Sequence, residues 1–357
     1  MSARLQVNVR IVGTGLIGTS IGLGLTRQGV SVTLEDASPA NQRLAADYGA
    51  GKVASTGDLP ELIVVCVPPD VTARVVSAQL QNYPQAVVTD VASVKSQIID
   101  ELAASGSDLS HYVGSHPMAG RERGGATSGR ADIFVGRPWV VAEHPEAGKM
   151  ALKLVEELAL DLGSTPIRMT PAEHDRAVAV VSHVPQLISS LLAARLNGAS
   201  GVELAGQGLR DTIRIAASDP KLWVQILGAN ASEVVSVLRA YQNDLDRVIE
   251  ALSDVSATGA LSAIDQAITA GNRGVQQLPG KHGSRRTELE SFTIIIEDRP
   301  GQLAKLFTEI NEIGINAEDV KLEHNPGAQL GMLELSVIPA SAQKLQDELT
   351  ARGWRFA

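Results

Sequence analysis

One histidine stands in a segment whose residue types favour proton transfer. His116 occurs in Gly114-Ser115-His116-Pro117-Met118-Ala119-Gly120, well downstream of a glycine motif at Gly13–Gly18. Imidazole has an ordinary pKa close to neutral pH, so it can accept a proton while a hydride leaves the same substrate carbon. The alternative is a loop histidine held by hydrogen bonds. Because the glycine motif is present, we favour a catalytic base.

The glycine motif, Gly13-Thr14-Gly15-Leu16-Ile17-Gly18, follows an apolar run and opens a helical pattern. Gly13 permits a tight turn, Gly15 lets the backbone approach a pyrophosphate, and Gly18 allows close packing of helix on strand. Asp36 closes the next predicted strand. An acid there binds ribose hydroxyls and repels a 2′-phosphate, which favours NAD over NADP. The alternative is a glycine turn beside a solvated acid. We therefore predict a dinucleotide site that includes Leu16 and Ile17.

Two later strands also end in residues that suit this site. Val67-Pro68-Pro69 ends one apolar run, and Asp90–Lys95 ends the next. The carboxyl ends of parallel strands form the edge where the nicotinamide half of the cofactor binds. Val67, Pro68 and Pro69 would supply a rigid wall, and the Ser93 hydroxyl would reach the substrate or His116. Lys95 is expected to be a cation on a helix surface.

Candidate substrate ligands lie in the second half of the chain. Asp211 and Arg214 stand three residues apart, so they share a helical face. A guanidinium matches the two oxygens of a carboxylate, and a neighbouring acid can hold it in place. The alternative is a structural ion pair. Histidines such as His174 are, taken alone, more often packed than catalytic. No group of His, Cys and carboxylates has the spacing of metal ligands, so no metal is expected.

The elements that must position these residues follow from periodicity. Up to residue 168, short β-branched runs alternate with helical stretches, which is typical of an α/β, doubly wound parallel sheet of the Rossmann type. The expected strands are Val7–Val12, Val30–Leu34, Leu62–Val67, Ala86–Val91 and Pro138–Ala142, and the expected helices are near 16–28, 38–48, 70–81 and 148–162.

From residue 169 to 274 we expect an all-helical domain. Thr170-Pro171-Ala172-Glu173 is a capping box. Pro185 should kink the first helix, Asn197-Gly198 should end it, and Asp219-Pro220 should start another. The surplus apolar face of such a domain often packs on a second subunit, so a homodimer is expected. Residues 275–290 read as a linker, and 291–357 follow a βαββαβ pattern.

Composition narrows the class of protein. The chain has 357 residues, a net charge of −9 and one cysteine, Cys66. The charge disfavours nucleic-acid and membrane partners, and the lone cysteine excludes a disulfide framework. We see no signal-type N-terminus and no apolar run approaching the ~20 residues of a membrane span. These features predict a soluble, cytoplasmic protein.

The chain resembles the prephenate dehydrogenase family. The motifs that carry the resemblance are GTGLIG, DVASVKS, GSHPMAGRERGG, EHD, SHVPQ and GLRDTIRIAASDPKLW, in this order from residue 13 to about 223. The C-terminal segment is similar to an ACT domain. The resemblance implies NAD-dependent oxidative decarboxylation of prephenate to 4-hydroxyphenylpyruvate, in tyrosine biosynthesis.

The resemblance also implies roles for individual residues. His116 would accept the proton of the ring hydroxyl, Ser93 would orient that hydroxyl, and Arg214 would hold a carboxylate with Asp211 beside it. The remaining substrate contacts would be Glu122 as a gate, Trp223 as a wall, and Ser182, Gln186 and His174. Several relatives carry histidine at the position of Gln186. A neutral amide there cannot neutralise an ammonium, which mildly favours prephenate over arogenate.

The ACT-like segment implies regulation by an amino acid. Its first turn contains Asp298, Pro300 and Gly301, and Asn316 follows the next helix. Such turns bind amino acids in ACT domains, so tyrosine is the expected effector. Three alternatives stay open. They are an arogenate dehydrogenase, a dehydrogenase of β-hydroxyacids or imines, and a non-catalytic sensor of NAD and amino acids.

Overall fold

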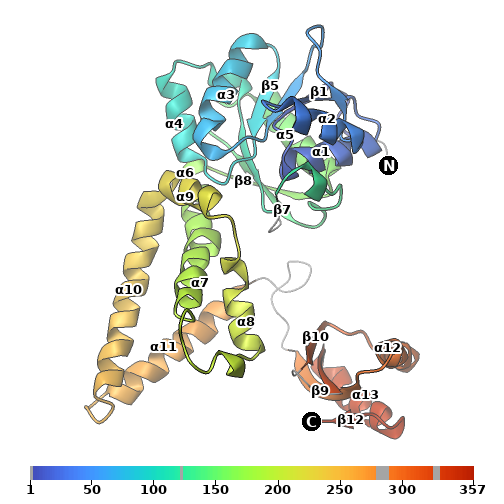
Figure 1. Cartoon of the computed structure of the whole chain (residues 1–357), viewed down its shortest axis with the longest axis vertical. Helices are drawn as coiled ribbons and strands as arrows, with labels where there is room; N and C mark the ends of the chain where they lie inside the picture. The colour runs from blue at the N-terminus through green and yellow to red at the C-terminus, as the bar shows by residue number, and fades with distance from the viewer. Residues whose placement is uncertain (1–2, 121–123, 279–288, 325–329) are drawn as a thin grey trace. The chain divides into compact units, whose positions relative to one another are not determined.

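The computed structural model describes residues 3–120, 124–278, 289–324 and 330–357. The chain divides into two compact units, Met1–Gln242 and Asn243–Ala357. Figure 1 shows both, with the helices and strands named below. The boundary between the two units falls within helix α10 (Ala231–Ser253).

The first unit contains a sheet of five parallel strands in the order β3-β2-β1-β4-β5. Their bounds are β1 Val9–Val12, β2 Val32–Glu35, β3 Lys52–Val53, β4 Leu62–Val65 and β5 Val87–Asp90. The strand order reverses between β1 and β4. In open α/β sheets the crevice beyond the carboxyl ends at such a point is where ligands bind.

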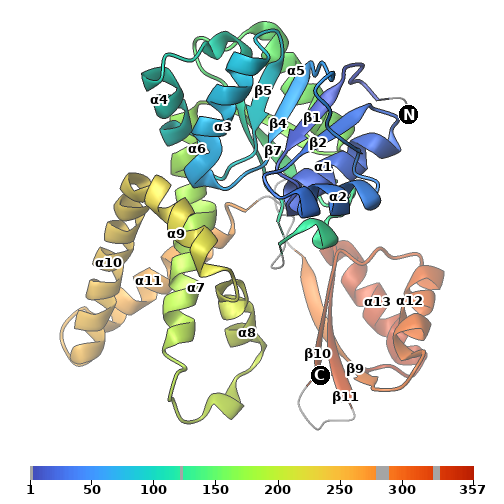
Figure 2. The same ribbon diagram turned by 45° about the horizontal axis from the view of Figure 1, so that its top comes forward.

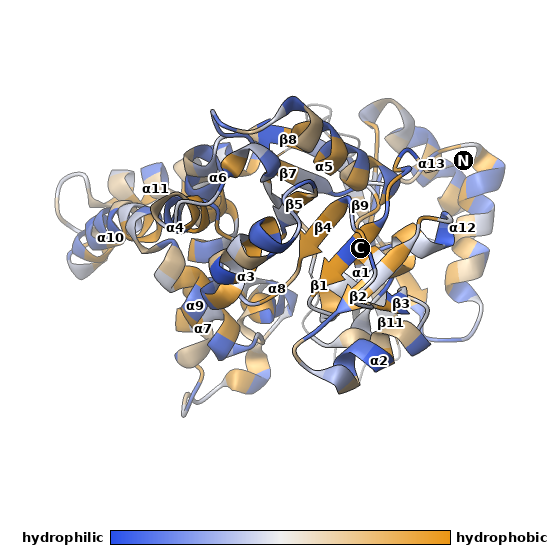
Figure 3. Cartoon of the chain, turned by 90° about the horizontal axis from the view of Figure 1, so that it is seen from above, coloured by the Kyte–Doolittle hydropathy of each residue, from blue (hydrophilic) through white to orange (hydrophobic). Residues whose placement is uncertain are grey.

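Helices cover both faces of this sheet (Figure 2). Apolar residues of α1 (Leu16–Arg27) and α5 (Lys149–Asp161) share one core cluster with the strands, whereas α3 (Pro69–Asn82) and α4 (Ser96–Ala104) share another. Helix α2 (Pro39–Asp47) follows β2. All of β4 is buried, and Figure 3 colours it as hydrophobic along its length. This confirms the doubly wound architecture.

A second, three-stranded sheet holds the candidate base. Strand β6 (Gly114–Pro117) pairs antiparallel with β7 (Pro138–Ala142), which pairs parallel with β8 (Thr165–Met169). His116 therefore lies in a strand, not in the loop that glycine and proline suggested. The run 138–142 is a strand as expected, but outside the parallel sheet. Tertiary pairing overrides the low strand propensity of this sequence. Strands β3, β6 and β8 and helix α4 were not expected.

The helical segment of the first unit begins as predicted. The Thr170 side chain accepts from the Glu173 amide and the Glu173 carboxylate accepts from the Thr170 amide, which completes the capping box of α6 (Pro171–Val178). A π-helix, Ala179–His183, joins α6 to α7 (Val184–Ala194). Pro185 has no N–H, and the wider turn before it takes the place of the expected kink.

The rest of this segment comprises α8 (Gln207–Ile213), the short 3₁₀ turn Arg214–Ala216 and α9 (Pro220–Ala229). Asp219 caps α9, as predicted. This helix ends at Ala229, and α10 starts at Ala231.

One apolar stretch is longer than the sequence analysis recognised. Among the described helices, the continuous stretch Pro171–Ala194 is long and apolar enough to cross a membrane by length and composition alone. The apolar character is confined to part of the stretch, because its first turns contain the charged residues Glu173, Asp175 and Arg176. The same stretch carries hydrogen-bonded side chains, including His174, Asp175 and Gln186, and a core helix passes the same test.

The second unit contains α11 (Ala260–Val275) and a four-stranded antiparallel sheet in the order β10-β11-β9-β12. The βαββαβ order is confirmed. Its elements are β9 Glu290–Glu297, α12 Gln302–Ile313, β10 Asp319–His324, β11 Leu330–Val337, α13 Pro339–Ala351 and β12 Arg355–Phe356. Helix α11 ends at Val275, the first residue of the expected linker. Most of the expected linker lies outside the described residues.

Candidate active site

The glycine turn has the geometry that a bound pyrophosphate requires. Gly13 adopts φ +98°, and a Cβ there would overlap the Cys66 carbonyl. A Cβ on Gly18 would overlap the Gly13 carbonyl, whereas nothing lies within 4 Å of the Cβ position of Gly15. Leu16 and Ile17 open helix α1 behind this turn. The turn is therefore tight on the protein side and open where a ligand would approach.

Asp36, rather than Glu35, faces the glycine turn. Its Oδ2 accepts from the Thr14 amide at 2.6 Å and the Thr14 hydroxyl at 2.7 Å, and its Oδ1 accepts from the Ser38 amide at 2.8 Å. Glu35 lies 3.7 Å from the buried Arg10 guanidinium. The carboxylate of Asp36 is thus held at the end of β2, beside the turn.

Residues 67–69 lie at the carboxyl end of β4, as predicted. Pro68 is the N-cap of α3 and Pro69 its first residue. The preceding thiol, Cys66, forms a long contact with the Val64 carbonyl, and burial raises its pKa. A thiol held protonated is a poor nucleophile, so Cys66 is a packing residue.

His116 is the outer member of a chain of three side chains. Its Nδ1 lies 2.9 Å from His174 Nε2, and His174 Nδ1 lies 2.7 Å from Asp175 Oδ1. The two rings meet edge to face, with centroids 5.1 Å apart. Oδ1 of Asp175 accepts from the Lys95 amide and Oδ2 from the Ser96 amide, at 2.9 and 2.7 Å. Sequence analysis missed this pairing.

The surroundings keep these imidazoles uncharged. Burial is the main cause that lowers the pKa of His116 well below its usual 6.5; His174, Lys95 and His183 add to the decrease, and Asp175 opposes it. Burial likewise lowers the pKa of His174. The pKa of Asp175 falls to about 2, because hydrogen bonds from His174 and Ser96 outweigh its burial. The acid is therefore ionised and both rings are neutral at pH 7.

Lys95 is not the surface cation that the sequence suggested. Its side chain is 1% exposed, pairs with the Asp90 carboxylate, and donates to the Ser115 carbonyl at 2.9 Å. The Tyr112 hydroxyl donates to the other oxygen of Asp90 at 2.7 Å. The strands β5 and β6 belong to different sheets and contact each other here, which no local sequence pattern could indicate. This buried network fixes the main-chain carbonyl of Ser115, the residue that precedes His116.

The helical side of the site is fixed by amide and hydroxyl contacts. Gln186 is buried and donates to Ser218 at 2.7 Å and to Ser190 at 3.3 Å. Ser189 donates to the Thr212 carbonyl at 2.9 Å. These bonds tie α7 to the segment that carries Arg214.

The other predicted substrate residues lie on neighbouring elements. Asp211 lies on α8 and accepts from Gln207 at 2.8 Å, and Arg214 begins the following 3₁₀ turn. Ser182 lies in the π-helix, four residues from Gln186. Trp223 meets His183 edge to face at 6.2 Å. His183 Nδ1 in turn bonds Asn230 at 3.0 Å, a buried contact that sequence analysis did not foresee.

The remaining predicted residues have varied outcomes. Glu122 lies outside the described residues. Ser93 is half-buried between the end of β5 and the start of α4. In the second unit, Gly301 caps α12 with φ +89°, Asp298 and Pro300 precede it, and Asn316 donates to Glu318 at 2.9 Å. No metal-binding group of His, Cys, Asp and Glu occurs in the described part of the chain.

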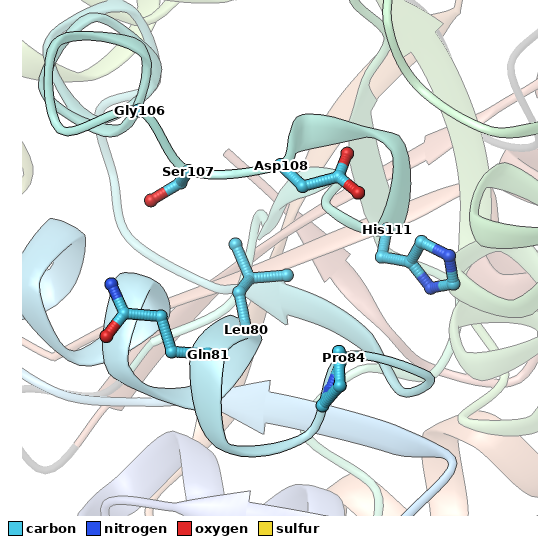
Figure 4. Close-up of a pocket in the computed structure, with 7 residues that line it drawn as sticks. All are labelled: Leu80, Gln81, Pro84, Gly106, Ser107, Asp108 and His111. Carbon is cyan, nitrogen blue, oxygen red and sulfur yellow. The ribbon is translucent and has the colours of Figure 1, made fainter.

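A separate pocket lies away from this chemistry (Figure 4). It is lined by Leu80, Gln81, Pro84, Gly106, Ser107, Asp108 and His111. Leu80 and Gln81 lie in the last turn of α3, and the other residues lie between α3 and β5 or between α4 and β6, so the pocket is at the amino edge of the strands. The residues predicted to bind the dinucleotide and the substrate lie at the opposite, carboxyl edge.

Comparison with known proteins gives two family matches, which together span residues 21–264. The nucleotide-binding domain of prephenate dehydrogenase matches residues 21–167, and the dimerization domain of prephenate dehydrogenase matches 170–264. A probable prephenate dehydrogenase of Streptomyces niveus is 35% identical over 353 residues, which is 96% of this chain and 98% of that protein.

Solved structures agree with these sequence matches. A prephenate dehydrogenase from Aquifex aeolicus, in complex with hydroxyphenyl propionate and NAD⁺, has a TM-score of 0.67 and 25% identity, covering 77% of this chain and all of that one. A Synechocystis arogenate dehydrogenase has a TM-score of 0.63 and 27% identity, covering 75% of this chain and 99% of that one.

Proposed function

Because the chain belongs to the prephenate dehydrogenase family, whose members are NAD-dependent oxidoreductases, we propose that its substrate is prephenate. The single observation that carries this proposal is the chain His116–His174–Asp175 at the carboxyl edge of the strands. It provides a neutral imidazole beside a dinucleotide site, as oxidation of an alcohol requires.

Each residue of the site would have a separate role in the reaction. NAD, when bound, supplies the hydride acceptor. His116 takes the proton of the ring hydroxyl on Nε2, and Ser93 orients that hydroxyl. The hydride would leave the carbinol carbon of the ring, so that the ring oxygen becomes a ketone. Loss of the ring carboxylate as carbon dioxide would then send the electron pair of that bond through the ring to this oxygen, which takes back a proton as the aromatic ring of 4-hydroxyphenylpyruvate forms. Positioning and exclusion of water supply most of the remaining catalysis.

Arg214 would hold a substrate carboxylate, with Asp211, Ser182, Gln186, Trp223 and Glu122 completing the pocket. Gln186 is the basis for preferring prephenate over arogenate. Its amide is neutral and already donates to two serines, so it offers no negative charge to the ammonium of arogenate. Asp36 together with Gly13, Gly15, Leu16, Ile17 and Gly18 would hold the adenosine and pyrophosphate of NAD, and residues 67–69 its nicotinamide half.

The test follows NADH formation with prephenate and with arogenate. We expect kcat/KM to be higher with prephenate, and His116→Asn to lower kcat by roughly 10²–10⁴ while NAD still binds. A higher kcat/KM with arogenate would establish the arogenate alternative. Turnover of neither substrate, with NAD binding intact, would favour the non-catalytic sensor, for which His116 and Arg214 are dispensable.

A homodimer is the second part of the proposal. Along α10, Tyr241, Leu245, Ile249 and Leu252 are 44–59% exposed at spacings of four, four and three residues. Such a stripe is typical of a helix that packs on another helix. Sedimentation should give twice the chain mass of 37.5 kDa. A monomer at micromolar concentration would refute this.

The remaining parts of the proposal concern organisation. We propose domains at 1–168, 169–274 and 291–357 joined by a linker at 275–290, with the last domain an ACT domain that binds tyrosine near Asp298, Pro300, Gly301 and Asn316. A cytoplasmic location would suit a biosynthetic enzyme that uses NAD, and cell fractionation would test it.

A further inference from the structure

We propose that His174 is a positioning residue that fixes the tautomer of His116, with the proton on Nδ1 and the lone pair on Nε2. This inference rests on the proposed role of His116 as the base. It differs from the substrate contact expected for His174 from the sequence. The His174 side chain is 1% exposed, and both of its ring nitrogens are occupied by protein partners.

The chain of hydrogen bonds starts at a fixed carboxylate. Asp175 accepts the amides of Lys95 and Ser96, at the start of helix α4, at 2.9 and 2.7 Å. The Asn230 side-chain amide, between α9 and α10, donates to the Asp175 main-chain carbonyl at 2.8 Å, so this residue is restrained from α4 and from the α9–α10 junction. An N-terminal helix turn favours a negative charge. Asp175 can therefore only accept hydrogen bonds.

Proton positions follow from that carboxylate. Because Asp175 accepts, His174 must donate from Nδ1 across the 2.7 Å contact. A neutral imidazole carries one proton, so Nε2 of His174 is an acceptor. His116 must then donate from Nδ1 across the 2.9 Å contact, and its own Nε2 is left without a proton. The base therefore presents its lone pair away from His174.

The neighbouring ionisable groups also keep His116 neutral before the reaction. Lys95 and His183 disfavour a positive charge on His116, and Asp175 favours one. The Lys95 ammonium is compensated by Asp90, and His183 is bonded to Asn230. When His116 takes a proton on Nε2, its Nδ1–H still donates to His174. The ionised Asp175 at the far end of the chain then stabilises the imidazolium that forms.

Nitrogen NMR of the NAD-bound enzyme tests the tautomer without substrate. The chain has 7 histidines, and the signals missing from His116→Gln identify those of His116. We expect wild-type His116 to carry its proton on Nδ1. In His174→Phe, which offers no acceptor, the proton should move to Nε2. A wild-type His116 protonated on Nε2 would overturn the proposal.

Kinetics give the second readout. His174→Phe should lower kcat by roughly 10²-fold, because the base has the wrong tautomer, with KM and NAD affinity within about threefold. His174→Gln should restore most of kcat, since its amide oxygen can accept from Nδ1. A folded His174→Phe protein with the kcat of wild type would also overturn the proposal.

A second variant covers the case in which His174→Phe does not fold. Asp175→Asn replaces the pure acceptor by an amide that can donate to His174, so it should also move the His116 proton to Nε2; an unchanged tautomer would refute the proposal. His144→Phe is the control, because His144 is also buried and, in the described part of the chain, its ring bonds the Tyr112 carbonyl rather than His116. If wild type turned over neither prephenate nor arogenate, the proposed function would fail while the NMR result still decided the tautomer.

Discussion

Burial disfavours the charged form of His116 and so lowers its pKa, which leaves the imidazole unprotonated at neutral pH. The ring lies in a strand, beside His174 and near the ammonium of Lys95, and both disfavour protonation. A base with a low pKa is a weaker proton acceptor but is almost entirely unprotonated before the reaction. Asp175 offsets part of that weakness once the proton arrives.

The pH dependence of turnover follows from this balance. Because the pKa of His116 lies well below 6.5, the neutral form persists as the pH falls through 6.5. We expect kcat/KM to stay level from pH 8 to 6.5 and to decline only at lower pH, about tenfold per pH unit. Steady-state assays in constant-ionic-strength buffers measure this. A half-maximal point above pH 6.5 would assign the base elsewhere.

The buried pair Lys95–Asp90 gives a stability prediction. Lys95→Met leaves the fully buried Asp90 without its cation, and loss of one partner of a buried pair costs about 3–5 kcal/mol. Urea unfolding should show this loss. Lys153→Met is the matched control, because Lys153 is 65% exposed and its pair with Glu157 is worth less than about 1 kcal/mol. Equal effects of the two substitutions would contradict the role of burial.

Sequence reasoning succeeded where the signal is local. The glycine turn and Asp36 are neighbours through one βαβ unit, so their spacing reports their geometry. His116 and His174 are 58 residues apart, and their contact depends on β6 packing beside β5 and on α6 meeting α4. The burial of Lys95 could not be predicted for the same reason. A lysine at the start of a helix is expected to be exposed, and its partners, Asp90 and the Ser115 carbonyl, come from two other strands.

Helices and strands differ in how well the local sequence predicts where they form. The capping box predicted the start of α6 to the residue, because side chain and backbone bond within four positions. Strand β6 was missed because its residues have low strand propensity and only pairing with β7 makes it a strand. The π-helix at 179–183 was missed for a similar reason, since Pro185 predicts a disturbance but not its form. Such widened turns are frequent at functional sites.

The junction of β1 and α1 offers a matched pair of substitutions. Gly18→Ala would force a Cβ into the Gly13 carbonyl and against Ile11, so we expect a loss of thermal stability of several degrees or failure to fold. Gly15→Ala meets nothing within 4 Å and has φ −72°, which alanine adopts freely. Its melting temperature should match wild type while NAD affinity falls at least tenfold.

Calorimetric titration of NAD and thermal unfolding separate the two effects. The turn would not be the pyrophosphate site if Gly15→Ala bound NAD as wild type does. The packing account of Gly18 would be wrong if Gly18→Ala unfolded at the wild-type temperature. Because both residues belong to one turn, each variant serves as the control for the other.

At the scale of the molecule, the last 69 residues form a core of their own. Apolar side chains from β9, β11, α12 and α13 pack on one another, and every buried member of this cluster lies between Ile294 and Trp354. Removal of the segment therefore exposes no apolar core outside itself. This separate core is what the proposed regulatory domain requires, since it could bind an effector without rearranging the first unit.

A chain that ends at Leu278 tests this interpretation. We expect kcat and the KM for prephenate to stay within about twofold, because the proposed site lies in the first unit, and inhibition by tyrosine to disappear. In the full-length chain, Asn316→Ala should weaken inhibition, whereas Gln343→Ala should not, since Gln343 lies on α13 and donates to Asp347 of the same helix. Initial rates over a series of tyrosine concentrations measure the inhibition of the shortened chain and of the two variants. Inhibition that persists in the shortened chain would place the effector site in the first unit, and loss of turnover would mean that the C-terminal segment supports the active site.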